Sequence, residues 1–160
     1  VALRLLEESQ ARSLEPGVNA YNSAVSSSGK NAQWCSALGL FQKMFKVDLR
    51  PDVRTYSALI GGSQRQCALA LFDEMALRNI APNQFTFSAL LGACKRGSHW
   101  THTMQLLADM RRHRLKPNAY AYSIAMDLLQ QEQQWERALW LMTEMRQDSV
   151  PASLVSYCTA

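Results

Sequence analysis

The chain has 160 residues, of which 48% are hydrophobic and 19% are charged, and this balance supports a folded core and excludes a disordered chain. Its apolar runs all fall short of the roughly 18 residues that a membrane-spanning helix needs, so no membrane span is predicted. The formal net charge of +4 permits an anionic partner without requiring one. The four cysteines lack the C-x-x-C spacing of zinc and redox sites, and we expect them to be buried in apolar helical patterns.

The first segment, residues 1–17, is interpreted as the second helix of an incomplete helix pair. Its opening residues, VALRLLEESQ, fit neither a signal peptide nor a basic, acid-poor transit segment. Because the chain opens on Val1 rather than Met, we expect a piece of a longer protein in which the targeting segment is not present.

Two amphipathic helices are predicted next, at 19–29 and 34–46. Apolar residues recur in the second at spacings of three and four, the stripe of a helix that faces a core: Trp34, Ala37, Leu38, Phe41 and Met44. The polar stretch SSGKNAQ separates the two helices. Pro51 follows them and ends the pair, because proline cannot continue a helix.

The next pair, predicted at 54–62 and 66–77, is four residues shorter than the others. The loss falls between Ile60 and Ala68, where GGSQRQC stands and the tryptophan of the turn is missing. A deletion of about one helical turn leaves both apolar stripes facing the core. We therefore predict a local irregularity, with helices shortened by about one turn.

Two further pairs are predicted at 85–95 with 100–113 and at 120–131 with 135–147, and residues 154–160 look like the start of another. Their first helices carry the same kind of stripe, such as Phe87, Leu90, Leu91 and Cys94. The predicted fold class is therefore all-α.

Three sets of markers recur along the chain with a period of about 35 residues. The core aromatics Tyr21, Tyr56, Phe87, Tyr122 and Tyr157 are separated by 35, 31, 35 and 35 residues, and each of the five prolines precedes one of them by five or six. The methionines Met44, Met75, Met110 and Met145 follow steps of 31, 35 and 35. Helix pairs that cannot bury their stripes alone are stabilised by stacking on one another, so an α-solenoid of helix-turn-helix repeats is predicted.

We place the repeats at 18–52, 53–83, 84–118 and 119–153, with partial repeats at 1–17 and 154–160. The repeated aromatics and methionines are expected to form the core. The tryptophans at the heads of second helices, in NAQW, GSHW and EQQW, are expected to join them, whereas Trp140 lies outside the pattern and is expected to be exposed.

The phrase PDVRTYSALI, the phrase ALALFDEM and the Pro-Asn or Pro-Asp junctions resemble the motif of the pentatricopeptide repeat family across nearly the whole chain. The tetratricopeptide family has a protein-binding groove and a 34-residue period, but it lacks the phrase of an aromatic followed by Ser or Asn. The tryptophan-bearing second helix is similar to a variant seen in algal organelle proteins. The resemblance implies sequence-specific binding of single-stranded RNA, one base per repeat, in organellar RNA processing, stability or translation. The implied organelle is a plastid or a mitochondrion, with the plastid favoured, and no enzymatic activity or cofactor is implied.

The resemblance also implies two base-reading slots per repeat: the residue after the core aromatic, and the residue after the proline at the repeat's end. The slots hold Asn22 with Asp52, Ser57 with Asn83, Ser88 with Asn118, and Ser123 with Ala152 or Ser153. In the family an Asn-Asp pair favours uridine and a small hydroxyl with Asn favours adenine. The implied RNA is 5′-UAAN-3′, with the chain's N-terminus at the 5′ side, and the fourth base is open because its second slot departs from the pattern.

Two readings of these slots stay open. Asp52, Asn83 and Asn118 each precede a predicted helix, where capping alone, at about 1 kcal/mol each, accounts for them. The helix slots are harder to explain structurally, because Ser and Asn are middling to poor helix formers beside a buried aromatic. A small polar residue in every complete repeat favours a functional, polar face.

The family places a further residue, three before each helix reader, between successive bases. This position holds Asn19, Arg54, Phe85 and Tyr120, of which the last three can stack on bases. Lys30, Lys95 and Arg96 lie near the ends of first helices, where they are candidates for phosphate contacts. His99 and His102 have no visible third ligand, so no metal site is predicted. No nucleophile–base arrangement is visible either.

The alternative to RNA binding is a structural role. The same solenoid is able to serve as a structural scaffold subunit of a large organellar assembly, such as a ribosome or a photosynthetic complex, by contacting protein. The short array, the shortened second repeat and the imperfect fourth reader favour this alternative.

Overall fold

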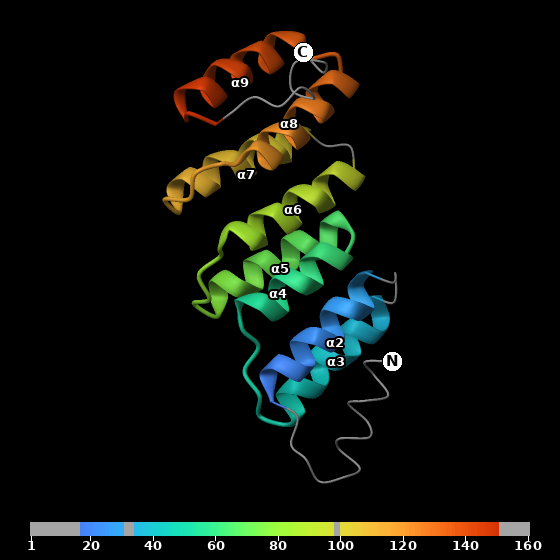
Figure 1. Cartoon of the computed structure of the whole chain (residues 1–160). Coiled ribbons are helices and arrows are strands. Elements are labelled where there is room, and N and C mark those ends of the chain that lie inside the picture. The colour runs from blue at the N-terminus through green and yellow to red at the C-terminus, as the bar shows by residue number, and fades with distance from the viewer. Residues whose placement is uncertain (1–16, 31–33, 98–99, 151–160) are drawn as a thin grey trace. The chain divides into compact units, whose positions relative to one another are not determined.

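The computed structural model describes residues 17–30, 34–97 and 100–150, and every regular element in these ranges is an α-helix (Figure 1). The helices are α2 (Val18–Lys30), α3 (Trp34–Lys46), α4 (Val53–Gly62), α5 (Arg65–Leu77), α6 (Gln84–Arg96), α7 (Trp100–Arg112), α8 (Ala119–Gln131) and α9 (Trp135–Gln147). These ranges contain no strand, so the all-α prediction is confirmed. None of the helices in the described part of the chain is long and apolar enough to cross a membrane.

Every observed helix begins and ends within one residue of its predicted bounds. For example, α4 was predicted at 54–62 and spans Val53–Gly62. The agreement follows from the junctions, where a proline ends one repeat and a polar residue caps the next. Asp52 accepts hydrogen bonds from the backbone N–H groups of Arg54 and Thr55, and this interaction fixes the start of α4.

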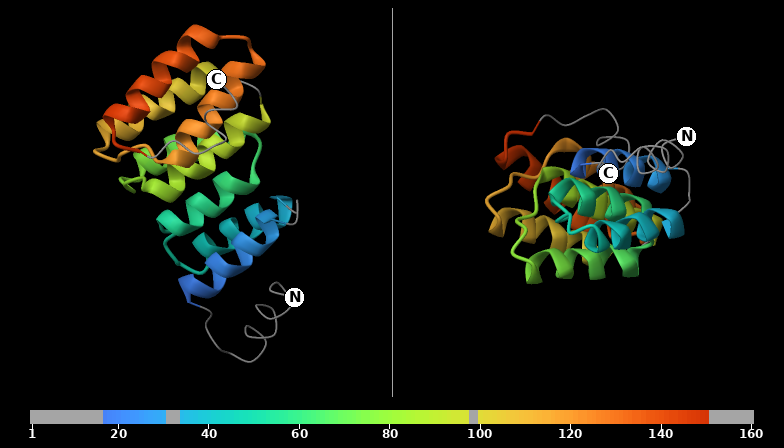
Figure 2. Two further views of the ribbon diagram at one scale, coloured as in Figure 1. Left: turned by 45° about the horizontal axis from the view of Figure 1, so that its top comes forward. Right: turned by 90° about the horizontal axis from the view of Figure 1, so that it is seen from below.

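Two compact units make up the chain, Val1–Ala89 and Leu90–Ala160, and their boundary falls inside α6. In the described part of the first unit, α2 packs against both α3 and α4, and α4 packs against α5. In the second unit, α8 packs against α7 and α9. Figure 2 shows the helices of each unit side by side from two further directions. Within each unit, neighbouring helix pairs therefore stack on one another.

The periodic aromatics and methionines that the structure describes form the core, as predicted, whereas Tyr157 lies outside the described residues. The described aromatics Tyr21, Tyr56, Phe87 and Tyr122 are fully buried, and so, to within 1% exposure, are Met44, Met75, Met110 and Met145. Successive repeats are joined by edge-to-face ring contacts, with centroids 5.3 Å apart for Phe41 and Tyr56 and 5.5 Å apart for Phe72 and Phe87. Such pairs contribute about 0.5–1.5 kcal/mol beyond the area they bury.

The second helices of all four repeats end in the same way. The buried methionine's carbonyl accepts a hydrogen bond from the N–H five residues later, for example Leu49 N to Met44 O at 2.9 Å. The residue before that donor has a positive φ, and in each repeat it is not a glycine: Asp48, Asn79, Arg114 and Ser149. This is a Schellman ending, which satisfies carbonyls at the helix end and turns the chain toward the junction proline.

The tryptophans at the heads of second helices are not core residues, so that prediction was wrong. Trp135 is 62% exposed, and Trp34 and Trp100 are half-buried. Each is the first residue of its helix, and helical side chains lean toward the N-terminus, so the indole extends past the helix end rather than into the core. Trp100 is covered instead by Arg137, whose guanidinium carbon lies 4.2 Å from the ring centroid. Trp140 is 51% exposed, as expected.

The cysteines are buried only in part. Cys94 lies on an apolar stripe and is buried, whereas Cys35 is exposed and Cys67 is half-buried. Neither of these two belongs to the buried face of its helix, which begins at Ala37 in α3 and at Ala68 in α5. The expectation that all cysteines are buried was therefore wrong for Cys35 and Cys67, and Cys158 lies outside the described residues.

The four residues that the second repeat lacks are missing from its first helix, α4, and from the turn that follows it. Helix α4 has 10 residues, whereas each of the other described helices has 13. The predicted irregularity is therefore present in α4, but α5 keeps its full length. Ser63 ends α4, because its N–H and its hydroxyl both donate to the carbonyl of Ile60.

Candidate nucleic-acid interface

The first pair of predicted reader residues is in direct contact. Asn22 on α2 donates from Nδ2 to Oδ1 of Asp52, the N-cap of α4, at 3.0 Å. The hydroxyl of Thr55 lies 2.5 Å from Asn22 Oδ1 and 3.0 Å from Asp52 Oδ1, and its single proton serves one of them at a time. The same hydroxyl accepts a hydrogen bond from the N–H of Asp52 at 3.1 Å, which closes a capping box.

These contacts hold Asp52 in its charged form. Partial burial raises the pKa of the Asp52 carboxyl, but hydrogen bonds from Thr55, Asn22 and the backbone N–H of Arg54 outweigh it, so the pKa falls below its ordinary value. The first reader site therefore carries a carboxylate at neutral pH.

The second reader pair is connected through a threonine. The hydroxyl of Ser57 donates to the carbonyl of Val53 at 2.7 Å and lies 2.9 Å from the hydroxyl of Thr86. Thr86 Oγ1 in turn lies 3.1 Å from Asn83 Oδ1 and accepts from the N–H of Asn83 at 3.2 Å. Asn83 also accepts from the backbone N–H of Thr86 at 3.0 Å, so Ser57, Thr86 and Asn83 form one hydrogen-bonded chain.

Thr55 and Thr86 were not singled out from the sequence. Each stands directly before the core aromatic of its repeat, and each is fully buried. A buried hydroxyl beside a core aromatic needs a hydrogen-bond partner, and this requirement was the available signal. Its partner on the preceding repeat could not be identified from local sequence.

The third reader pair lacks the threonine. Asn118 caps α8, and its Oδ1 accepts from the backbone N–H of Ala121 at 2.9 Å. Ala121 occupies the position in α8 that Thr55 holds in α4 and Thr86 holds in α6, and it has no hydroxyl. Ser88, the other reader of this repeat, is half-buried on α6.

The fourth repeat is described only in its first slot. Ser123 is half-buried on α8, and its hydroxyl donates to the carbonyl of Tyr120 at 3.0 Å. The second slot, Ala152 or Ser153, lies outside the described residues.

The side chains of the second slots cap helices with one of their polar atoms, and their other polar atom takes no part in capping. Asp52, Asn83 and Asn118 all accept backbone N–H groups at helix starts, and each does so through Oδ1. Within the described residues no protein group bonds to Asp52 Oδ2, Asn83 Nδ2 or Asn118 Nδ2. Each second slot therefore retains a polar atom that is able to bind a ligand.

A polar hollow of about 650 Å³ lies beside the first reader. It is lined from α2 and α4 by Asn19, Asn22, Ser23, Ser26, Ser27, Arg54 and Ala58. The lining includes one predicted reader, Asn22, and two of the residues predicted to lie between bases, Asn19 and Arg54. Amides, hydroxyls and a guanidinium are the groups that hydrogen-bond base edges and phosphates.

The predicted stacking residues are exposed, although two are large aromatics. Phe85 is 78% exposed and Tyr120 is 50% exposed. The hydroxyl of Tyr120 lies over Gly92, where an added Cβ would be 3.5 Å from it. Arg54 is exposed too, and its side chain has no partner among the described residues. These side chains offer flat, accessible surfaces to a base.

Of the predicted phosphate contacts, Lys95 is already paired. Its Nζ lies 2.8 Å from Oδ2 of Asp127, and this hydrogen bond and charge raise the pKa of Lys95. Arg96 is exposed at the end of α6. Lys30 ends α2, and its side chain lies outside the described residues.

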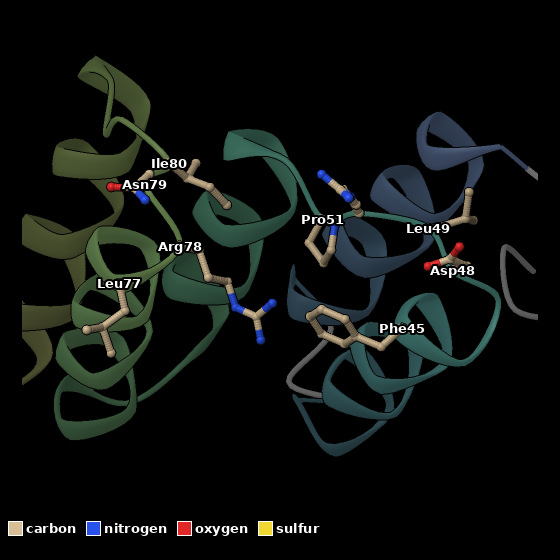
Figure 3. A pocket seen from close by; sticks show the side chains of 9 residues that line it. Phe45, Asp48, Leu49, Pro51, Leu77, Arg78, Asn79 and Ile80 are labelled. Atoms are coloured by element: carbon tan, nitrogen blue, oxygen red, sulfur yellow. The ribbon is translucent and has the colours of Figure 1, made fainter.

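A second hollow, of about 610 Å³, lies at the junctions that follow α3 and α5 (Figure 3). Its apolar lining comes from Phe45, Leu49, Pro51, Leu77 and Ile80, and its polar lining from Asp48, Arg50, Arg78 and Asn79. Arg78 reaches toward Phe45, with its guanidinium carbon 4.6 Å from the ring centroid, and pairs with Glu74 at 2.8 Å. This hollow was not predicted from the sequence. Its signal was Phe45 and Leu77, apolar residues that stand outside the helix stripes.

An ionic cluster ties the helices of the second unit together. Arg111 on α7 contacts Glu144 at 2.8 Å and Asp148 at 3.2 Å, and its guanidinium also donates to the hydroxyl of Tyr122 at 3.0 Å. Tyr122 donates to Asp148. Burial, followed by the hydrogen bond to Asp148, raises the pKa of Tyr122 to about 12. The cluster stabilises the stacking of α7, α8 and α9.

Within the described ranges no three His, Cys, Asp or Glu side chains are grouped so that they could hold a metal ion. His99, one of the two histidines considered from the sequence, lies outside those ranges.

Comparison with solved structures places the fold among pentatricopeptide repeat proteins. PPR10, described from maize, in complex with an 18-nt psaJ RNA element is 24% identical, with a TM-score of 0.80 over 99% of this chain and 24% of PPR10. The PPR domain of Arabidopsis thaliana protein-only RNase P 1 in complex with tRNA is 15% identical, with a TM-score of 0.81 over 98% of this chain and 84% of that domain. This chain thus spans about a quarter of the length of PPR10. No curated protein matches it significantly.

The sequence profile of the pentatricopeptide repeat domain matches residues 4–65, 40–97 and 70–132, and the profile of the single PPR repeat matches residues 120–150. Together these matches run through nearly the whole chain, and the solved structures share its stacked helix pairs. The fold is thus an α-solenoid of helix-turn-helix repeats, and the chain belongs to the pentatricopeptide repeat family.

Proposed function

We propose that this chain binds single-stranded RNA, one base per repeat, through the residues that follow the core aromatics and the junction prolines. The observation that carries the proposal is the pair of hydrogen-bonded reader sites, Asn22 with Asp52 and Ser57 with Asn83. Each keeps polar atoms to which no group among the described residues is hydrogen-bonded. The PPR10 and RNase P 1 structures, which are described as complexes with RNA and tRNA, support the proposal.

The first site has the chemistry to select uridine. Asn22 has a second N–H on Nδ2, and Asp52 has an unused carboxylate oxygen. The Watson–Crick edge of uracil offers a carbonyl acceptor next to an N–H donor, and the two side chains complement that pattern. Cytosine has no N–H at the ring nitrogen, so it would face the carboxylate with an acceptor.

The second site has the chemistry to select adenine. Asn83 Nδ2 is a donor, which suits adenine N1, and the hydroxyl of Ser57 has lone pairs that suit the exocyclic amine. Ser88 with Asn118 repeats this pair in the next repeat. The proposed preference is therefore 5′-UAAN-3′.

Stacking and phosphate contacts would supply the remaining affinity. Bases stacked on Phe85, Tyr120 and Arg54 would gain roughly 1–3 kcal/mol each, or about 3–9 kcal/mol for the three before ordering costs. A micromolar dissociation constant needs about 8 kcal/mol. We therefore expect at best micromolar binding by this chain alone, and tighter binding where further repeats continue the array.

The proposed cellular role is to protect, position or expose an RNA segment for processing, stability or translation in a plastid or mitochondrion. It is a binding role without catalysis. The flanking repeats of a longer array would extend the RNA segment that is recognised.

The test is to reprogramme one base. Ser57→Asn with Asn83→Asp should move the preference at the second base from adenine toward uridine, because the pair then matches Asn22 with Asp52. The measurement is a titration of the chain with short RNAs that differ only at that base. The matched control, Ser88→Asn with Asn118→Asp, should shift the third base and leave the second unchanged. Binding that ignores base identity in every variant and only weakens with salt would overturn the proposal.

A second candidate function is protein binding at the junction hollow. It is favoured by the exposed apolar side chains there and nearby, since Leu77 is 83% exposed, Val47 46% and Phe45 40%. A photo-crosslinking amino acid at Leu77 in the native cell would then capture protein, whereas one at Ser57 would capture RNA under the first proposal. Protein capture at both positions would favour the scaffold role.

A further inference from the structure

We propose that Thr55 and Thr86 are positioning residues that sharpen base selection by the repeat before them, and that Ala121 leaves the following reader pair without this support. The inference rests on the proposed RNA-binding function. Each threonine belongs to one repeat, yet its hydroxyl contacts a reader residue of the preceding repeat.

The geometry is the same at both sites. Thr55 and Thr86 are each the third residue of a first helix, and each is fully buried. Each accepts the N–H of the residue that caps its own helix, at 3.1 Å for Asp52 and 3.2 Å for Asn83. Each also approaches the reader that follows the preceding core aromatic. One hydroxyl therefore connects both slots of a reader pair.

This connection fixes which atoms a base would meet. At the first site, Thr55 holds Asn22 Oδ1 while Asp52 holds Nδ2, so the amide cannot turn over to exchange its donor and acceptor ends. At the second site no direct contact joins Ser57 to Asn83, and Thr86 is the bridge between them. Without it the Ser57 hydroxyl keeps its bond to the Val53 carbonyl but loses its second partner, so its lone pairs and proton are presented to a base in a less defined pattern.

The two sites differ in how much they depend on threonine. The Asn22–Asp52 hydrogen bond of 3.0 Å survives removal of Thr55, whereas the Ser57–Asn83 connection does not survive removal of Thr86. Thr86→Ala should therefore reduce base discrimination more than Thr55→Ala.

The chain holds its own control, because the same reader types occur with and without the threonine. Ser57 with Asn83 has Thr86, and Ser88 with Asn118 has Ala121 at the matching position. Adenine should accordingly be preferred more strongly at the second base than at the third.

The experiment measures the ratio of dissociation constants for RNAs with adenine or uridine at one base. Thr86→Ala should lower that ratio at the second base about three- to tenfold, the range expected for one neutral hydrogen bond, and should leave the ratio at the first base unchanged. Thr86→Ser should keep the wild-type ratio. An unchanged ratio in Thr86→Ala, or an equal loss of affinity for every RNA, would show a purely structural threonine and overturn the inference.

A measurement without RNA separates the two proposals. In the NMR spectrum of the free chain, Thr55→Ala should shift the resonances of the Asn22 side-chain amide, because Asn22 Oδ1 loses its hydrogen-bond donor, and Thr55→Ser should not. If wild type shows no base preference, the proposed function fails, and the positioning role in base selection fails with it. If wild type shows a preference but the amide and the ratios are unaffected by the alanine variants, only the threonine inference fails.

Discussion

The two units use the same repeat framework, but different interactions join their helix pairs. In the first unit, aromatic rings pack edge to face between repeats: Phe41 with Tyr56, and Phe72 with Phe87. In the described part of the second unit no two aromatic rings pack in this way, and Arg111 instead binds Tyr122, Glu144 and Asp148. The core tyrosine and methionine of each repeat are buried in both units.

The difference shows that the periodic core determines the fold. The contacts that join neighbouring repeats are either aromatic or ionic on the same framework. Tyr56 and Tyr122 show the exchange at one position, because the ring of Tyr56 packs on Phe41 of the preceding repeat, whereas the hydroxyl of Tyr122 accepts a hydrogen bond from Arg111 of the preceding repeat. Apolar contacts between repeats do not depend on salt, whereas exposed ionic ones weaken as salt is added. The units should therefore respond differently to truncation and to ionic strength.

The largest effect is expected from truncation in the first unit. Phe41→Ala should lower the free energy of unfolding by about 3–5 kcal/mol, because Phe41 is only 5% exposed and contacts the rings of Phe45 and Tyr56. Urea unfolding followed by circular dichroism measures the change, and it should not depend on salt. Phe41→Leu should cost less than about 1.5 kcal/mol. The neighbouring exposed Gln42→Ala is the matched control, with a change within about 0.5 kcal/mol. A cost for Phe41→Ala no larger than that of Gln42→Ala would show that the ring contacts do not join the repeats.

This core could be predicted from the sequence because its apolar residues recur with a fixed period. At each junction a proline and a polar capping residue also fix where the next repeat's first helix begins. The tryptophans were misplaced because the helical stripe does not show that a side chain at the first helical position leans past the helix end. The contacts of Asn22 with Asp52 and of Ser57 with Thr86 join residues about 30 positions apart. Such contacts depend on how one pair stacks on the next, which no local pattern specifies.

A smaller effect is expected at the ionic cluster of the second unit. Arg111→Met should lower the free energy of unfolding by about 1–2 kcal/mol, because it removes charged hydrogen bonds and leaves Glu144 and Asp148 facing each other. The Arg111 side chain is 38% exposed, so solvent screening limits the effect, and 1 M salt should reduce it further. The matched control is Arg112→Met, since Arg112 is 80% exposed and, among the described residues, pairs only with Asp109 three residues away. Equal costs for the two variants in urea unfolding would remove the proposed contrast between the units.

The smallest effect is expected at Lys95, and it also bears on RNA binding. Its pair with Asp127 is exposed, with the Lys95 side chain 48% accessible, so Lys95→Met should cost about 0.2–1 kcal/mol in urea unfolding. Because the ammonium is already paired with a carboxylate, it should release few counterions when RNA binds. The salt dependence of RNA affinity should therefore change by much less than the value near 0.7 per phosphate contact expected for single strands. Arg54→Met is the comparison, since Arg54 lines the polar hollow without a side-chain partner among the described residues, and it should lower the slope more. A drop in slope for Lys95→Met as large as that for Arg54→Met would mean that RNA displaces Asp127 and that Lys95 is a phosphate contact after all.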